Sequence, residues 1–196
     1  MKTKLTILLS LIFSLAVADG GGGKYSHGCR VHALDNTTNV FFTSIDGKIK
    51  YLNEKNKEEF AYTTTNISVF NISENTTANL FPENFNEGII EFYFESSYND
   101  FKKKISFNGN DNDYNDNYIV GNYDIPKRAV CDKVFVITYN FETKQYSFWV
   151  AHKTGKDLQR VYQCTAESNY YFDVKNQVIR FEKQNGSKIE IKDIKY

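Results

Sequence analysis

Short runs in which apolar and polar residues alternate recur along the chain, and such alternation is typical of β-strands that bury one face. The clearest run is 88–96, GIIEFYFES. It predicts a half-buried strand with Ile90, Phe92 and Phe94 on the inner face. The polar residues between them are then expected on an outer, solvated face.

Two hairpins are predicted from turn signals between such runs. Asp46-Gly47 favours a two-residue turn, because both positions of that turn need positive φ, so 40–53 is expected to fold back on itself. A second hairpin joins 134–141 to 146–151. Its strands are apolar on both faces, which places them centrally in a sheet or in the wall of a closed barrel.

Strand register follows from the rule that a one-residue slip moves every side chain to the opposite face. In the second hairpin, Tyr139 is expected opposite Phe148. In the C-terminal hairpin, a three-residue loop at 184–186 would pair Phe181 with Ile189 and keep the apolar residues of both strands on one face.

Aromatic residues make up 16% of the chain, with 14 Tyr and 16 Phe, and these residues are strand formers. No long helical pattern separates the strands, although 157–164 fits either a short strand or a helix. The chain is therefore predicted to be all-β, as a single antiparallel β-sandwich or barrel-like domain over 29–196. Turn spacing indicates roughly eight to ten short, hairpin-connected strands.

The first 18 residues read as a secretory signal peptide, with Lys2 and Lys4 before a short apolar run and a small-residue cleavage pattern. Four consecutive glycines then predict a flexible arm over 19–28. Without the leader, 22 Lys and Arg stand against 24 Asp and Glu, a formal charge of −2. We expect a secreted, extracellular protein with no membrane span and no nucleic-acid partner.

Three cysteines remain after the leader: Cys29, Cys131 and Cys164. An exported protein is expected to oxidise them, so one disulfide and one odd thiol are predicted. If 131–164 is a three-strand meander, its two cysteines lie at opposite ends, about 20 Å apart, and Cys29 must pair with one of them. The odd thiol could then link two chains as a dimer.

Five Asn-X-Ser/Thr sequons mark the chain as a candidate glycoprotein. Three of them, Asn66, Asn71 and Asn75, lie on the stretch 66–77, which is expected to be an edge strand that buries Phe70 and Ile72 and turns Asn71 and Asn75 outward. Asn66 would then sit at a bend or the strand's start, or stay unmodified. The other two sequons, Asn36 and Asn185, lie next to predicted turns.

Glu91 and Glu95 are the one pair of residues that suggests catalysis. A retaining glycosidase needs two carboxyl groups about 5 Å apart. The strand that carries them, EFYFE, resembles the E-x-D-x-E strand of jelly-roll β-glucanases over five residues, with Tyr93 in place of the middle acid. The resemblance implies a nucleophile and an acid/base. A solvated outer face accounts for the same residues.

No metal or cofactor is expected. His27, His32 and His152 lack the spacing of a zinc site, and the Asn- and Asp-rich stretch 108–117 fails the calcium-loop pattern in every register. Trp149 is a candidate for stacking on a ligand, with a place in the core as the alternative.

These features favour a secreted, N-glycosylated protein that acts by binding a small apolar ligand, a glycan or an extracellular protein. The plan is similar to that of a lipocalin in length, export and strand number, although the G-x-W sequence expected near the first strand is missing. A small glycoside hydrolase using Glu91 and Glu95 is the first alternative. A structural or adhesive extracellular protein is the second.

Overall fold

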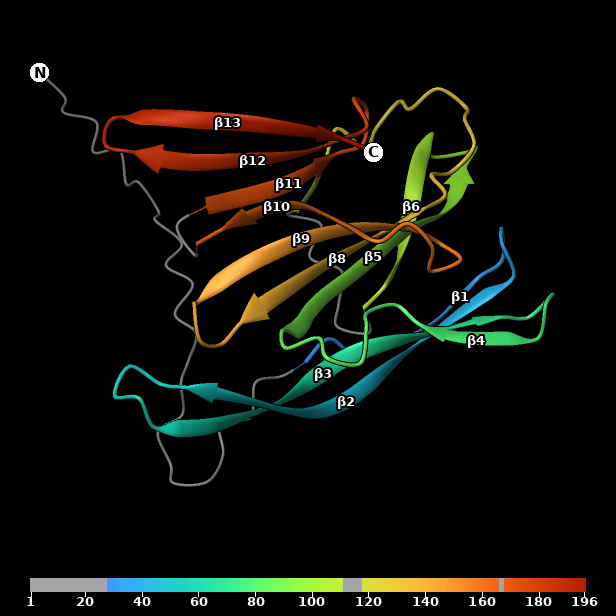
Figure 1. Ribbon diagram of the computed structural model, residues 1–196. Coiled ribbons are helices and arrows are strands. Elements are labelled where there is room, and N and C mark those ends of the chain that lie inside the picture. The colour runs from blue at the N-terminus through green and yellow to red at the C-terminus, as the bar shows by residue number, and fades with distance from the viewer. Residues whose placement is uncertain (1–27, 111–117, 166–167) are drawn as a thin grey trace, which may run out of the picture.

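A computed structural model describes residues 28–110, 118–165 and 168–196. Over this part the chain forms thirteen β-strands and no helix, which confirms the all-β prediction but exceeds the expected number of strands (Figure 1). The predicted signal peptide (1–18), nearly all of the predicted arm (19–28) and most of the loop 108–117 lie outside the described residues.

The strands form a nine-stranded sheet and a four-stranded sheet, arranged in three layers (Figure 1). The larger sheet supplies the first and middle layers, which stay connected where β3 pairs with β5 at Thr64 and Ile89. The first layer holds β1 (His32–Asp35), β2 (Val40–Leu52), β3 (Glu58–Asn71) and β4 (Thr76–Asn79). The middle layer holds β5 (Gly88–Asn99), β6 (Lys104–Gly109), β8 (Lys133–Asn140), β9 (Gln145–His152) and β10 (Gln159–Cys164). The third layer holds β7 (Ile119–Val120), β11 (Ser168–Asp173), β12 (Val178–Asn185) and β13 (Lys188–Lys195).

The middle layer is apolar on both faces, and each face is covered. On one face, Phe92 and Phe94 pack with Phe42 of the first layer. On the other, Phe135 and Phe148 pack against the third layer. This confirms the central position predicted for the hairpin now seen as β8–β9. Its register pairs Tyr139 with Tyr146, two residues from the predicted pairing, so the faces are preserved.

The predicted hairpin over 40–53 is wrong. β2 continues straight through Asp46-Gly47 and pairs along its whole length with β3, with a register shift between Ile45 and Asp46. A Cβ on Gly47 would lie 2.6 Å from the Thr65 hydroxyl. The glycine therefore permits a close approach between strands, and the chain reverses instead at 53–57.

The predicted C-terminal register is also wrong. Gly186 and Ser187 form a two-residue turn that pairs Asn185 with Lys188, so Glu182 lies opposite Ile191 and Gln184 opposite Ile189. The two isoleucines therefore share a face with polar residues and are 66% (Ile189) and 61% (Ile191) exposed. The tip of this hairpin projects past β10 and β11, where no layer covers it, so burial does not determine the register (Figure 1).

The face and edge predicted for 66–77 are wrong as well. β3 lies between β2 and β4, so it is not an edge strand. Within this stretch the buried apolar side chains are Ile67 and Val69, Phe70 is only partly buried, and Ile72 is exposed. The register shift next to Asn66 breaks the alternation, so that Asn66 and Ile67 are both buried and the buried face continues through Val69.

Candidate functional site

Glu91 projects from β5 toward the third layer, and not to solvent as its alternating pattern predicts. Its carboxylate accepts hydrogen bonds from the hydroxyls of Tyr93 (2.7 Å) and Tyr170 (2.5 Å), the latter on β11. Burial raises the pKa of Glu91, and the two tyrosine hydrogen bonds offset only part of that rise. The ring of Tyr118 stacks on Tyr170 at 5.0 Å and closes this cluster.

Glu95 lies on the same face of β5 and is completely buried. Arg128 donates to both of its carboxylate oxygens, each at 2.7 Å, and the Cys131 backbone N–H donates to one of them at 2.7 Å. Four residues of strand separate Glu95 from Glu91, about 13 Å between Cα atoms. Each carboxylate is held by a different set of partners, so the structure does not assemble the pair that a glycosidase requires.

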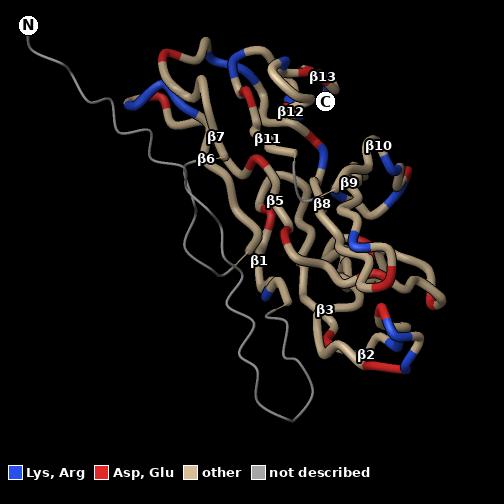
Figure 2. Tube along the Cα trace, turned by 90° about the vertical axis from the view of Figure 1, so that its left-hand side faces the viewer, with Lys and Arg blue, Asp and Glu red and all other residues tan. Residues whose placement is uncertain are grey.

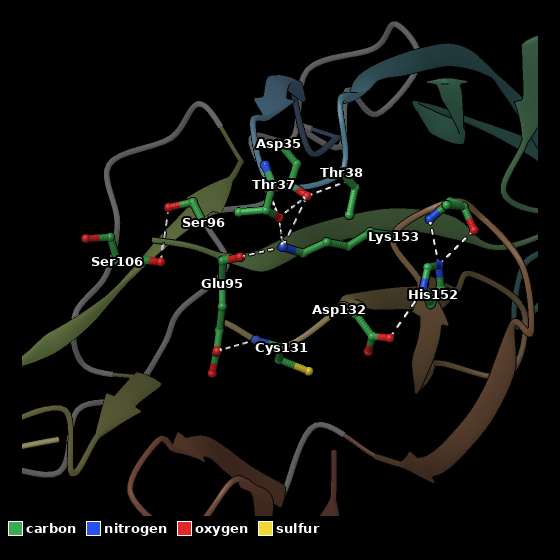
Figure 3. A network of polar contacts seen from close by, with 11 residues as sticks. Asp35, Thr37, Thr38, Glu95, Ser96, Ser106, Cys131, Asp132, His152 and Lys153 are labelled. Atoms are coloured by element: carbon green, nitrogen blue, oxygen red, sulfur yellow. Dashed lines mark hydrogen bonds and ion pairs between the residues drawn. The ribbon is translucent and has the colours of Figure 1, made fainter. Parts of the chain in front are cut away.

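The backbone of Glu95 belongs to a second polar network, drawn in Figure 3. Its carbonyl oxygen accepts a hydrogen bond from the Lys153 ammonium at 2.7 Å. Lys153 is completely buried and lies 3.2 Å from the carboxylate of Asp35, which is also buried. Burial alone would raise the pKa of Asp35, but hydrogen bonds from Thr38 and Thr37 and the charge of Lys153 lower it overall. Lys153 thus ties β1 to β5 through one ion pair and one hydrogen bond.

His152 precedes Lys153 in the chain and makes a separate set of contacts (Figure 3). Its Nδ1 accepts the Thr154 backbone N–H at 3.1 Å, which places the ring proton on Nε2, 3.2 Å from the Asp132 carboxylate. Nδ1 also lies 2.7 Å from the Thr154 hydroxyl. This carboxylate–imidazole–hydroxyl chain closes the turn after β9, because Thr154 is only two residues from His152.

Trp149 is half-buried beside Phe81 and Phe85, and its indole N–H donates to Thr138 at 2.9 Å. The structure thus packs it against the core between the first and middle layers, and not on an open surface. His32 is exposed on β1, and His27 lies outside the described residues.

The described residues contain no disulfide bond. Cys29 is buried, and Cys131 and Cys164 are half-buried. The stretch 157–164 is mostly strand, so Cys164 lies at the Tyr146 end of the meander, away from Cys131. The predicted pairing of Cys29 with one of them, and a dimer through the odd thiol, stay predictions.

The five sequons divide by exposure. Asn66 is 8% exposed, and its amide is engaged with the backbone of Phe81, donating to the carbonyl at 2.8 Å and accepting from the N–H at 3.0 Å. The other four asparagines lie in turns or at strand ends and are exposed or half-buried; they are Asn36, Asn71, Asn75 and Asn185. Glycosylation itself stays a prediction.

The outer face of the third layer carries a hollow of ≈ 290 Å³. Its lining comes from three adjacent strands and their turn, and consists of Asn169, Glu182, Gln184, Ser187 and Ile189. Tyr171 donates to the Glu182 carboxylate at 2.9 Å, and the Gln184 amide donates to the Gly186 carbonyl at 3.1 Å. These hydrogen bonds fix the positions of two lining side chains, Glu182 and Gln184.

Sequence reasoning did not find this hollow or the Asp35–Lys153 pair. The hollow exists because the Gly186–Ser187 turn sets a register that no burial pattern indicates. Lys153 follows the strand 145–152 as an ordinary lysine, and only the folded chain brings it to Asp35 from more than a hundred residues away.

The described part of the chain contains no cluster of three metal-ligating side chains and no helix that is long and apolar enough to cross a membrane. Lys and Arg are interspersed with Asp and Glu along the trace (Figure 2). Comparisons with known protein families, curated proteins and solved structures found no match.

Proposed function

We propose that this protein is exported, is N-glycosylated, and acts by binding an uncharged, hydroxyl-rich ligand, such as a glycan segment, in the hollow on the outer face of β11, β12 and β13. The observation that carries the proposal is the lining itself. It combines four hydrogen-bonding side chains with one exposed apolar side chain, Ile189.

The chemistry of the lining suits a polyhydroxylated ligand. An amide offers two donors and an acceptor, a carboxylate accepts only, and a hydroxyl does both, so together they can satisfy groups that both donate and accept. Ile189 supplies apolar contact to the carbon–hydrogen face of a sugar ring. The bonds that Tyr171 and Gly186 make to Glu182 and Gln184 reduce the entropy lost on binding.

A glycan attached at Asn185 would not block the hollow. Asn185 and Gln184 are consecutive on β12, so their side chains point to opposite faces, and Asn185 bonds to Glu190 on the inner side. A glycan on Asn185 would therefore extend from the face opposite the hollow.

The test is binding of the secreted chain to an array of neutral oligosaccharides of glucose, mannose and N-acetylglucosamine. We expect Gln184→Ala and Ile189→Ala each to lower the affinity for the captured glycan at least about tenfold, because each removes one of the few contacts of a shallow site. Matched controls are Gln163→Ala and Ile72→Ala, which are exposed elsewhere and should bind as the wild type does. The proposal is wrong if no oligosaccharide binds, or if both hollow variants bind normally.

A further inference from the structure

β13 forms the open edge of the third layer. It pairs with β12 on one side, and no strand of the described residues pairs with its other side. It is a regular strand of eight residues without bulge or proline, and seven of the eight are exposed. Such an edge presents a row of backbone groups that can pair with another strand.

The direction of these groups can be assigned from one hydrogen bond. The Tyr196 N–H donates to the carbonyl of Gln177, beside β12, at 3.1 Å. Because backbone groups alternate between the two sides of a strand, Glu190 and Lys192 also direct theirs to β12. Ile191 and its alternate neighbours therefore present their N–H and C=O groups at the open edge.

We propose that β13 pairs in antiparallel fashion with β13 of a second copy of this chain, with Ile191 opposite the partner's Ile191 on a twofold axis. This register pairs outward-directed residues with each other, as antiparallel hydrogen bonding requires. It places Glu190 opposite the partner's Lys192, and symmetry repeats that opposite-charge pair.

The adjacent registers with the same backbone geometry are unfavourable. A shift of one residue per copy in one direction places Glu190 opposite itself and Lys188 opposite the partner's Lys192, both like-charged. The same shift in the other direction places Lys192 opposite itself. Charge complementarity of the strand with itself therefore selects the register centred on Ile191.

The same register brings together, on the outer face, the apolar residues that the hairpin leaves exposed. Residues paired across two strands project on one face, so the Ile191 side chains of the two copies meet on the outer face. Ile189 of each copy lies diagonally beside the partner's Ile191, within reach of a long side chain. Four otherwise exposed isoleucines thus gather around the axis.

Pairing would join the third layers of the two copies into one sheet, with both hollows on the same face. This arrangement would add avidity for a repeating ligand if the proposed function is correct. The proposed pairing is argued from β13 alone, so an experiment can disprove dimer formation without disproving ligand binding, and the reverse.

Sedimentation equilibrium of the full secreted chain under reducing conditions tests the pairing, since reductant removes any disulfide-linked dimer. We expect a monomer–dimer equilibrium for the wild type. Glu190→Lys and Lys192→Glu should each weaken it about 10- to 100-fold, because each converts two opposite-charge pairs into like-charge pairs. Glu74→Lys and Lys55→Glu change the same charges on exposed turns of the first layer, away from β13, and should leave the equilibrium unchanged.

The most discriminating experiment mixes the Glu190→Lys and Lys192→Glu variants. One copy then carries two lysines and the other two glutamates at these positions, so a heterodimer regains both opposite-charge pairs, and its affinity should return to that of the wild type. A misfolded variant could not show this recovery. A wild type that stays monomeric up to about 1 mM, variants that dimerise normally, or a mixture that stays monomeric would each overturn the proposal.

Discussion

Lys153→Met tests whether the buried ion pair holds the first layer to the middle layer. Methionine retains most of the volume of the side chain but removes its charge. The substitution leaves the Asp35 carboxylate completely buried, with only Thr37 and Thr38 to hydrogen-bond it. It also removes the donor to the Glu95 carbonyl, 2.7 Å away.

The expected loss is large. Removing one partner of a buried ion pair costs about 3–5 kcal/mol, because the remaining charge stays desolvated without a counter-ion. A chain of this kind has a total unfolding free energy of about 5–15 kcal/mol, so the variant should lose a substantial fraction of its stability. Urea denaturation followed by circular dichroism gives the change directly as a lower midpoint at similar slope.

Two further variants separate the pair from the lysine alone. Lys127→Met removes an exposed ion pair to Asp100 and should leave the midpoint within experimental error. Asp35→Asn combined with Lys153→Met removes both charges and should be more stable than Lys153→Met alone. A Lys153→Met protein within about 1 kcal/mol of the wild type would refute the assignment of this pair as a structural connection.

Three further predictions concern single positions. Because burial raises the pKa of Glu91, the protonated carboxyl stabilises the fold, and this contribution should be lost as the pH rises above about 4.5 through the raised pKa. Over that pH range the urea midpoint of Glu91→Gln should therefore rise above that of the wild type. Midpoints that stay parallel would contradict this prediction. Gly47→Ala should lower the unfolding free energy by about 1–3 kcal/mol, measured in urea, since its Cβ would overlap Thr65; an unchanged midpoint would contradict the close approach. Mass-spectrometric glycan mapping should find Asn66 empty and Asn36 occupied, and an occupied Asn66 would contradict its buried hydrogen bonds.

Local patterns predicted the existence of strands well. The alternation in 88–96 corresponds to β5, and the doubly apolar runs correspond to β8 and β9, the strands covered on both faces. Such patterns arise from contacts that each strand makes with a whole layer, so they survive errors in pairing. The prediction for Ile90 is wrong, because a register shift between Ile89 and Glu91 directs Ile89, and not Ile90, into the core between the first and middle layers.

Register and partner identity could not be read from the pattern. Asp46-Gly47 has ideal turn chemistry, yet the sheet uses its glycine for a close approach to Thr65. An alternating glutamate looks the same whether it faces water or a partner distant in sequence, and both Glu91 and Glu95 have such partners. These outcomes depend on residues distant in sequence, which no local window contains.

The most direct test of the central claim is an NMR titration of the ¹⁵N-labelled protein with a neutral oligosaccharide selected on the array. The account predicts that the largest amide shifts cluster at Asn169, Glu182, Ser187 and Ile189, on the outer face of the third layer. Shifts that centre instead on Glu91 and Glu95, or the absence of any saturable shift, would contradict the hollow as the binding site.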